Sequence, residues 1–353
     1  MSSRLTWLTW RQFRAQAIVA AAALAVVAIA LAVTGPHLAG LYASNGLATC
    51  QAHGNCETLK TSFMDQVKSS TPDGRLFALG IGLLLAAPAL IGVFWGAPLV
   101  TREIEAGTFR LAWTQSVTRA RWLAVKLGLI GLASMAAVGL LSLMVGWWAS
   151  PLDRVTGLPD RGGAAPGFNR LAPVLFASRG VAPIGYAAFA FALGVTVGVL
   201  IRRTVPAMAV TLALFAAVQV VMPLWVRPHL IPPSHAATAL DPATIIAMST
   251  SADGRFINVG AAVDLPGAWI LDNQTLTPGG RVFTGPAPAA CVSNNAPFSE
   301  CQAALGRLDL RQLVTYQPAG RYWVFQWYEA GIFLVLAGAL CGCCAWLIRR
   351  RAP

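Results

Sequence analysis

The charged residues best placed to bind another protein lie in one polar stretch, 101–122, between two long apolar runs. It contains Arg102, Glu103, Glu105 and Arg110, with apolar residues such as Phe109 interleaved. This mixture is typical of a short helix at a membrane surface, with one apolar face and one face open to a soluble protein. We interpret the stretch as a docking element through which a partner moves the membrane part. The alternative is a solvated loop without a partner.

The sequence lacks the residue patterns of nucleotide and metal chemistry. A phosphate-binding P-loop needs a Gly-Lys pair before Ser or Thr, but each of the three lysines follows leucine or valine. The four histidines show no H-E-x-x-H spacing. For Cys341, Cys343 and Cys344 we favour packing against a neighbouring helix over metal binding or lipidation. We therefore expect no catalytic residue, no metal site and no cofactor in this chain.

Four further cysteines fall in loops that we assign below to the outer, oxidising side of a membrane. Cys50 and Cys56 share one loop, and Cys291 and Cys301 share another. Disulfides form in oxidising compartments, so two local pairs are expected, although four unpaired thiols are the alternative.

Glu329 is the acidic residue that lies well inside an apolar run, about six residues past its outer end. An intramembrane charge is costly, by about 3 kcal/mol at mid-bilayer on insertion scales, and usually serves a purpose. Trp323, Trp327 and Tyr328 resemble an interfacial aromatic belt, so we expect Glu329 to lie shallow and wet. Its role is either a gate or pathway residue or a structural hydrogen bond.

Composition explains why these groups must be positioned by membrane helices. The chain has 353 residues, of which 56% are hydrophobic and 11% charged, and its mean hydropathy is +0.61. Soluble domains are nearer a quarter charged. Apolar runs of a length that crosses roughly 30 Å of hydrocarbon predict six spans, at about 15–33, 76–100, 123–148, 183–201, 205–226 and 323–347. An amphipathic interfacial helix is expected over 1–14, where Trp7, Trp10 and Phe13 lie beside arginines.

Charge asymmetry predicts the orientation. Six spans place both termini on one side, where thirteen cations share short segments with only Glu103 and Glu105. Cations in short loops mark the cytoplasmic side, so both termini are expected to be cytoplasmic. The net charge of +12 then reflects topology and contact with anionic lipid, and we expect no nucleic-acid partner.

The segment 227–322 is too long for a simple connector. Residues 268–272 and 280–283 flank a Thr-Pro-Gly-Gly turn signal, which predicts a β-hairpin. A short helix is expected over 299–314, with Leu305, Leu308 and Leu313 on its apolar face. We predict a small α/β extracellular domain over 227–322, between the fifth span and a region of 323–353 that holds the sixth span and a basic tail.

Glu-Ile-Glu-Ala-Gly-Thr-Phe-Arg at 103–110 and Trp-Thr-Gln-Ser-Val-Thr-Arg-Ala-Arg-Trp-Leu-Ala-Val-Lys at 113–126 resemble the first cytoplasmic loop of ABC-2 type transporter permeases. The position of this motif after the second of six spans strengthens the resemblance, and actinobacterial members are the most similar. The resemblance implies a type V exporter fold, with a coupling helix at about 101–113. The family's ATPase-coupling role carries over to Glu103, Glu105, Gly107 and Thr108. We also predict that the neighbouring residues Arg102, Phe109 and Arg110 take part in the coupling. One departure is the length of the connection between the fifth and sixth spans, which is short in compact members.

What the resemblance implies for function is the membrane subunit of an ATP-driven exporter at the cell membrane. Two permease copies would pair with two cytosolic P-loop ATPase subunits, and ATP and Mg would be bound by those partners. Few charges in the spans favour a hydrophobic or amphipathic cargo such as an antibiotic, peptide or lipid. The alternative is a non-transporting signalling or scaffold protein with a ligand-binding extracellular domain.

Overall fold

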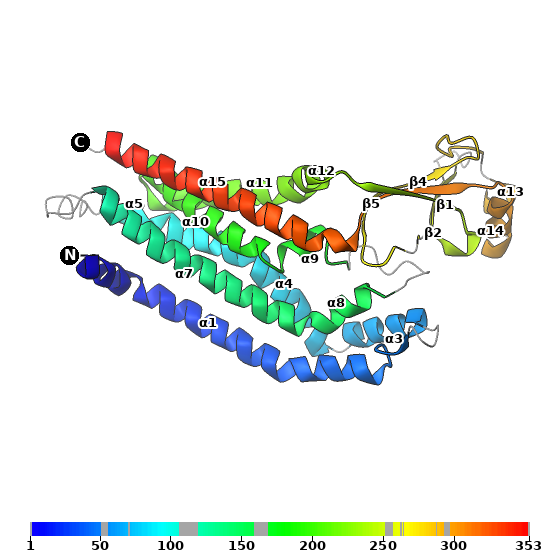
Figure 1. The fold of residues 1–353 in the computed structure, drawn as a ribbon, viewed down its shortest axis with the longest axis horizontal. Helices are drawn as coiled ribbons and strands as arrows, with labels where there is room; N and C mark the ends of the chain where they lie inside the picture. The colour runs from blue at the N-terminus through cyan, green and yellow to red at the C-terminus, as the bar shows by residue number, and fades with distance from the viewer. Residues whose placement is uncertain are drawn as a thin grey trace.

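The protein is an elongated helical bundle with a small mixed α/β region at one end, seen in a computed structural model (Figure 1). The structure describes residues 2–50, 56–69, 71–105, 119–158, 169–250, 257–261, 263, 265–286, 288–292 and 297–351. Both termini lie at the end of the bundle opposite the strands (Figure 1). We call these the terminal end and the sheet end.

Six helices in the described part are long and apolar enough to cross a membrane: Phe13–Ser44, Asp73–Glu103, Arg121–Trp148, Ala182–Ile201, Thr204–Leu230 and Ala319–Ile348. They agree with the six predicted spans. In chain order the elements of the bundle are α1 Ser2–Ser44, α3 Cys56–Ser69, α4 Thr71–Ile91, the π-helix η1 Gly92–Gly96, α5 Pro98–Glu105, α7 Arg119–Trp148, α8 Ser150–Thr156, α9 Pro173–Ala177, α10 Ala182–Ile201, α11 Thr204–Val221, the π-helix η2 Met222–Val226, α12 Arg227–Leu230 and α15 Tyr322–Arg351.

The second span is not one regular helix. It passes through α4, η1 and α5, and Pro88 and Pro98 flank the π-helical segment. Proline has no N–H for the carbonyl four residues before it, so local widening of the helix is the expected response. The two prolines therefore account for the irregularity of this span.

The helix α10 is the centre of the bundle and contacts α4, η1, α5, α7, α11 and α15. Its backbone touches that of the second span through glycines. A Cβ on Gly194 would lie 2.2 Å from the carbonyl oxygen of Gly92, and one on Gly96 would lie 2.6 Å from that of Phe191. The hydrophobic effect does not drive helices together in lipid, so packing depends on close van der Waals contact, which small residues such as glycine allow.

The first span differs from the prediction at both ends. A single helix, α1, runs from Ser2 to Ser44 with Pro36 inside it, so the expected interfacial helix of 1–14 is continuous with the span. The helix also extends beyond residue 33 because Leu38 is fully buried in a cluster with Phe63 of α3. Between these ends α1 exposes Ile18, Val26 and other large apolar side chains.

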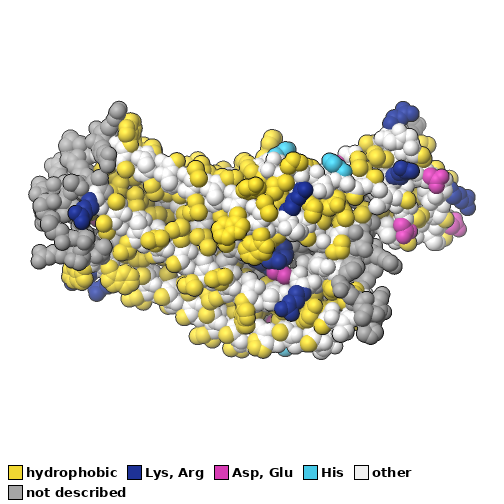
Figure 2. All heavy atoms as spheres, in the orientation of Figure 1, with side chains coloured by type: hydrophobic (Ala, Val, Ile, Leu, Met, Phe, Trp, Pro, Cys, Tyr) yellow, Lys and Arg dark blue, Asp and Glu magenta, His cyan; other side chains and the backbone are white. Residues whose placement is uncertain are grey.

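Two small antiparallel sheets form the sheet end. A three-stranded sheet has the order β1-β5-β4, and a two-stranded sheet pairs β2 with β3. The elements here are β1 Ser234–Ala239, η3 Pro242–Thr244, β2 Ile245–Thr250, β3 Ile257–Ala261, β4 Trp269–Leu276, α13 Ala289–Val292, α14 Phe298–Gly306, β5 Arg311–Gln317 and η4 Ala319–Arg321. Charged side chains gather on this region, whereas the visible bundle surface is largely apolar (Figure 2).

The expected hairpin turn is present: Thr277 N–H donates to the Arg281 carbonyl at 2.8 Å, and Leu276 bridges Val282. The main partner of β4 is instead the distant strand β5. The helix predicted over 299–314 is wrong in its second half, because α14 ends at Gly306 and β5 begins at Arg311. Burial alternates along the start of β5, where Gln312 and Val314 point inward, which is the period of a strand.

Candidate functional site

The second span ends, at the terminal end of the bundle, against the start of the fifth. Thr204, the first residue of α11, donates its backbone N–H to Glu105 Oε1 at 2.9 Å and its hydroxyl to Glu105 Oε2 at 2.5 Å. A carboxylate at a helix N-terminus satisfies an unpaired N–H and complements the helix dipole. The Thr204 hydroxyl, followed by the Thr204 N–H, lowers the pKa of the Glu105 carboxyl below its ordinary value, and Arg203 adds to this effect. Glu105 is therefore ionised at neutral pH.

A second ionic contact joins the end of the second span to the third. Lys126 of α7 donates to Glu103, and its ammonium group also lies 4.5 Å from the ring centroid of Trp122. The lysine side chain is only 4% exposed. The last residues described before position 106 are thus bonded to two other spans, through Glu103 and through Glu105.

The structure describes three of the seven predicted coupling residues. Arg102, Glu103 and Glu105 lie in the last turns of α5, and Arg102 is exposed. Gly107, Thr108, Phe109 and Arg110 lie outside the described residues, so the predicted helix of 101–113 is described only over 101–105. Sequence reasoning missed the partner residue Thr204, whose N-terminal position after Arg202-Arg203 was the available signal.

Glu329 is fully buried at the sheet end, so the expectation of a wet position is wrong. Arg227 donates through Nε to Glu329 Oε2 at 2.8 Å and through Nη2 to Oε1 at 3.0 Å, and the Tyr186 hydroxyl also donates to Oε1. The two charged side chains are 1% and 0% exposed. A bidentate pair with a third donor offsets part of the cost of burying both charges. The cluster joins α10, α12 and α15.

Arg227 is the functional candidate that sequence reasoning missed. Its guanidinium carbon lies 3.9 Å from the ring centroid of Phe176 in α9 and 6.0 Å from that of Trp269 in β4. Nη1 has no hydrogen-bond partner among the described residues, so the aromatic faces stabilise that side of the cation. The available signal was an arginine directly after the apolar fifth span, opposite in charge to Glu329.

Gln326, one turn before Glu329, holds the start of α10. Its side-chain oxygen accepts from the backbone N–H groups of Val181 and Ala182, at 2.9 and 2.8 Å. Its Nε2 donates to the carbonyl of Phe176 and to the Tyr322 hydroxyl, both at 3.2 Å. This fully buried amide satisfies N–H groups that a helix start leaves unpaired. The sheet ends of α9, α10 and α15 are therefore fixed to one another.

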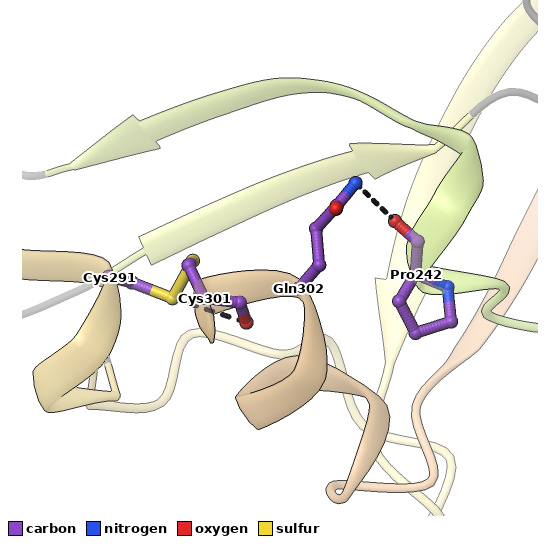
Figure 3. Close-up of a disulfide and its surroundings, with 4 residues drawn as sticks. All are labelled: Pro242, Cys291, Cys301 and Gln302. Carbon is purple, nitrogen blue, oxygen red and sulfur yellow. Dashed lines mark hydrogen bonds between the residues drawn. A yellow bond between two sulfur atoms is a disulfide. The ribbon is translucent and has the colours of Figure 1, made fainter. Parts of the chain in front are cut away.

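The four loop cysteines are paired in the structure as the sequence leads us to expect. Cys50 bonds to Cys56 and Cys291 to Cys301, with Cα–Cα distances of 4.9 and 4.6 Å. The second bond joins α13 to α14, and Gln302 beside it donates to the Pro242 carbonyl at 2.9 Å (Figure 3). Within the described residues, no group of His, Cys, Asp and Glu has a metal-binding arrangement.

Six apolar spans, of which the central one, α10, is the most buried, define a polytopic α-helical protein of the plasma membrane. Residues 21–227 match the model of the family described as ABC-2 membrane transporter related, which is more than half of the chain. The chain belongs to this family, whose members are transmembrane subunits that generally work with a separate ATPase. No curated protein matches. No solved structure matches either.

Proposed function

We propose that this protein is the permease subunit of an ATP-driven exporter and is driven by a separate P-loop ATPase. The observation that supports this proposal is that the last residues described before the segment 106–118 are bonded to two other spans. The Glu103–Lys126 and Glu105–Thr204 contacts lie where the family resemblance places the coupling element. A force applied to residues 106–118 would reach the second, third and fifth spans together.

The proposed orientation has the terminal end in the cytoplasm and the sheet end outside. Cations in short segments support this assignment, because Arg202, Arg203 and the arginines near both termini lie at the terminal end. The two disulfides at the other end support an oxidising environment there. The α/β region of 227–322 would then be extracellular, although the family match stops at residue 227.

We propose two permease copies with two ATPase copies, each ATPase binding ATP and Mg. ATP binding would close the ATPase pair, press on the 101–113 element and shift the permease dimer between two packings. The largely apolar spans favour a hydrophobic or amphipathic cargo, such as an antibiotic, peptide or lipid. The buried Arg227–Glu329 pair is the candidate outer gate, since it joins the fifth and sixth spans where cargo would leave.

The test is purification of the tagged full-length chain from its native host, followed by reconstitution with any P-loop ATPase that copurifies. Glu103→Gln removes one carboxylate charge and keeps the side-chain shape. We expect the complex to assemble and the permease-stimulated ATP hydrolysis to fall several-fold. Glu300→Gln, an exposed residue of α14, is the matched control and should leave the rate unchanged. Purification of the permease without any ATPase would contradict the proposal.

The alternative function is a signalling or scaffold protein whose outer region binds a ligand. The separate α/β region outside the family match is the observation that favours it. The same preparation separates the two functions, because a scaffold would leave ATP hydrolysis by a bound ATPase unchanged in Glu103→Gln.

A further inference from the structure

A cavity of about 190 Å³ lies at the terminal end, between the first turns of α1, the π-helical part of the second span and α7. A single water needs on the order of 10–15 Å³ by the same measure, so the space fits a group much larger than water. Each helix contributes residues at helical spacing: Phe13 and Gln16 from α1, Trp95 and Leu99 from the second span, and Lys126 from α7. The cavity is thus built from three defined helix faces.

The lining changes from apolar to polar toward the terminal end of the second span. Phe94, Trp95 and Leu99 come first, and Arg102 and Glu103 follow about one turn after Leu99. The ring of Phe13 meets that of Trp95 edge to face, with centroids 4.8 Å apart. An occupant that matches this lining has an apolar part directed toward the bilayer and a polar part directed toward the terminal end.

The net charge of the cavity lining indicates which polar group the occupant would carry. Within the lining, Lys126 and Glu103 neutralise each other as an ion pair. The exposed guanidinium of Arg102 makes no ion pair with the described residues, so the cavity carries one uncompensated positive charge. Gln16 adds an amide donor, which here contacts the Phe94 carbonyl at a long 3.4 Å. That carbonyl is accessible because Pro98, four residues later, has no N–H to donate to it.

The depth of the cavity matches the level of lipid headgroups. Trp7 and Trp10, on the first turns of α1, are 59% and 53% exposed, and exposed tryptophans mark the membrane–water interface. Anionic lipids attract basic residues at this level. We propose that the cavity binds the glycerophosphate group of an anionic membrane phospholipid, with the phosphate at Arg102 and the glycerol and upper acyl chain against Trp95 and Leu99.

This site goes beyond the proposed export function and does not depend on it, because lipid binding requires neither ATP nor cargo. A bound lipid would fill the space between α1 and the second span, directly beside the Glu103–Lys126 contact. It would therefore stabilise the terminal end of the bundle in the arrangement described here.

The experiment measures lipid binding to the detergent-purified full-length protein by native mass spectrometry. Phosphatidylglycerol, phosphatidylcholine and glycerol 3-phosphate are titrated in turn. We expect one tightly held phosphatidylglycerol per chain, weaker phosphatidylcholine binding, and no displacement by glycerol 3-phosphate. Arg102→Gln should weaken phosphatidylglycerol binding about fivefold, the loss expected for one basic side chain near an anionic lipid surface. The matched control is Arg121→Gln, an exposed arginine of α7 outside the lining, which should change the affinity less than twofold.

A second pair of variants tests the cavity itself. Leu99→Trp should fill it and weaken both lipids, whereas Leu90→Trp, at an exposed leucine of α4, should not. Unchanged gel-filtration profiles show that both variants fold. Equal affinity for the two lipids, or equal effects of Arg102→Gln and Arg121→Gln, would overturn the proposal. Displacement by glycerol 3-phosphate would also overturn it, since the ligand would then be a soluble phosphate ester.

Discussion

Breaking the buried Arg227–Glu329 pair should strongly destabilise the protein. Arg227→Met leaves a carboxylate with only the Tyr186 hydroxyl as donor, and Glu329→Gln leaves a guanidinium without a counter-charge. Both side chains are at most 1% exposed. Removing one partner of such a pair costs about 3–5 kcal/mol, because the remaining charge is still buried.

The size of the expected thermal shift follows from chain length. The entropy of unfolding of globular proteins is about 2.1 cal/mol/K per residue near the midpoint. For 353 residues, a loss of about 3–5 kcal/mol corresponds to a fall in Tm of roughly 4–7 °C. Thermal unfolding in detergent, followed by intrinsic tryptophan fluorescence, measures this shift. Glu300→Gln at the exposed surface should change stability by no more than about 0.5 kcal/mol.

The double variant Arg227→Met/Glu329→Gln decides whether the charge pair is the cause. It removes both charges and keeps an acceptor for Tyr186, so we expect it to be more stable than either single variant. Independent sites would instead add within about 0.3–0.5 kcal/mol. Additive losses, or single losses below about 1 kcal/mol as at exposed pairs, would refute the assignment of a buried, mutually dependent pair.

Three further outcomes are expected. Gly194→Ala should abolish folded, monodisperse protein, because its Cβ would lie 2.2 Å from a carbonyl oxygen of the second span. Gly128→Ala is the control, because Gly128 has open space around it; it should leave the gel-filtration profile unchanged and the Tm equal or slightly higher. Cys291→Ser should lower the stability of the α/β region by about 2–3 kcal/mol, the entropic effect of a disulfide separated by 10 residues, measured by limited proteolysis. The depressed pKa of Glu105 stabilises the fold at pH values above the unfolded-state pKa, and this contribution is lost as pH falls through the folded-state pKa. Thr204→Val should therefore shift the acid limb of the Tm–pH profile to higher pH, and an unchanged limb would contradict the contact.

Apolar run length was sufficient to predict the spans, because crossing a bilayer is a local requirement on composition. Local signals also predicted the Thr277–Gly280 turn and the pairing of nearby cysteines. The helix near 299–314 was predicted to extend too far, because Leu313 fits a helical face as well as a strand that pairs with the distant β1 and β4. Leu308 lies in the turn between α14 and β5. Strand pairing of that kind depends on partners that sequence periodicity does not identify.

The candidate sites were predicted by residue type but not by partner. Glu105 was identified as a coupling residue and Glu329 as an acid within an apolar run. Their partners Thr204 and Arg227 are 99 and 102 residues away in the chain. An acid in an apolar run signals that a compensating group exists. Only the packing of the spans reveals which group it is and whether the acid is buried.

The positions of these contacts give the helix α10 a particular mechanical role. Near its terminal end, Gly194 and Gly198 meet the carbonyls of Gly92 and Ala97 in the second span. At its sheet end, Tyr186 and the Gln326-bound N–H groups connect it to α15. Backbone groups in direct contact leave no flexible side chain between them to absorb a displacement, and close-packed interiors transmit strain. A shift of the second span at the terminal end must therefore either move α10, and with it the Arg227–Glu329 pair, or break the glycine contacts.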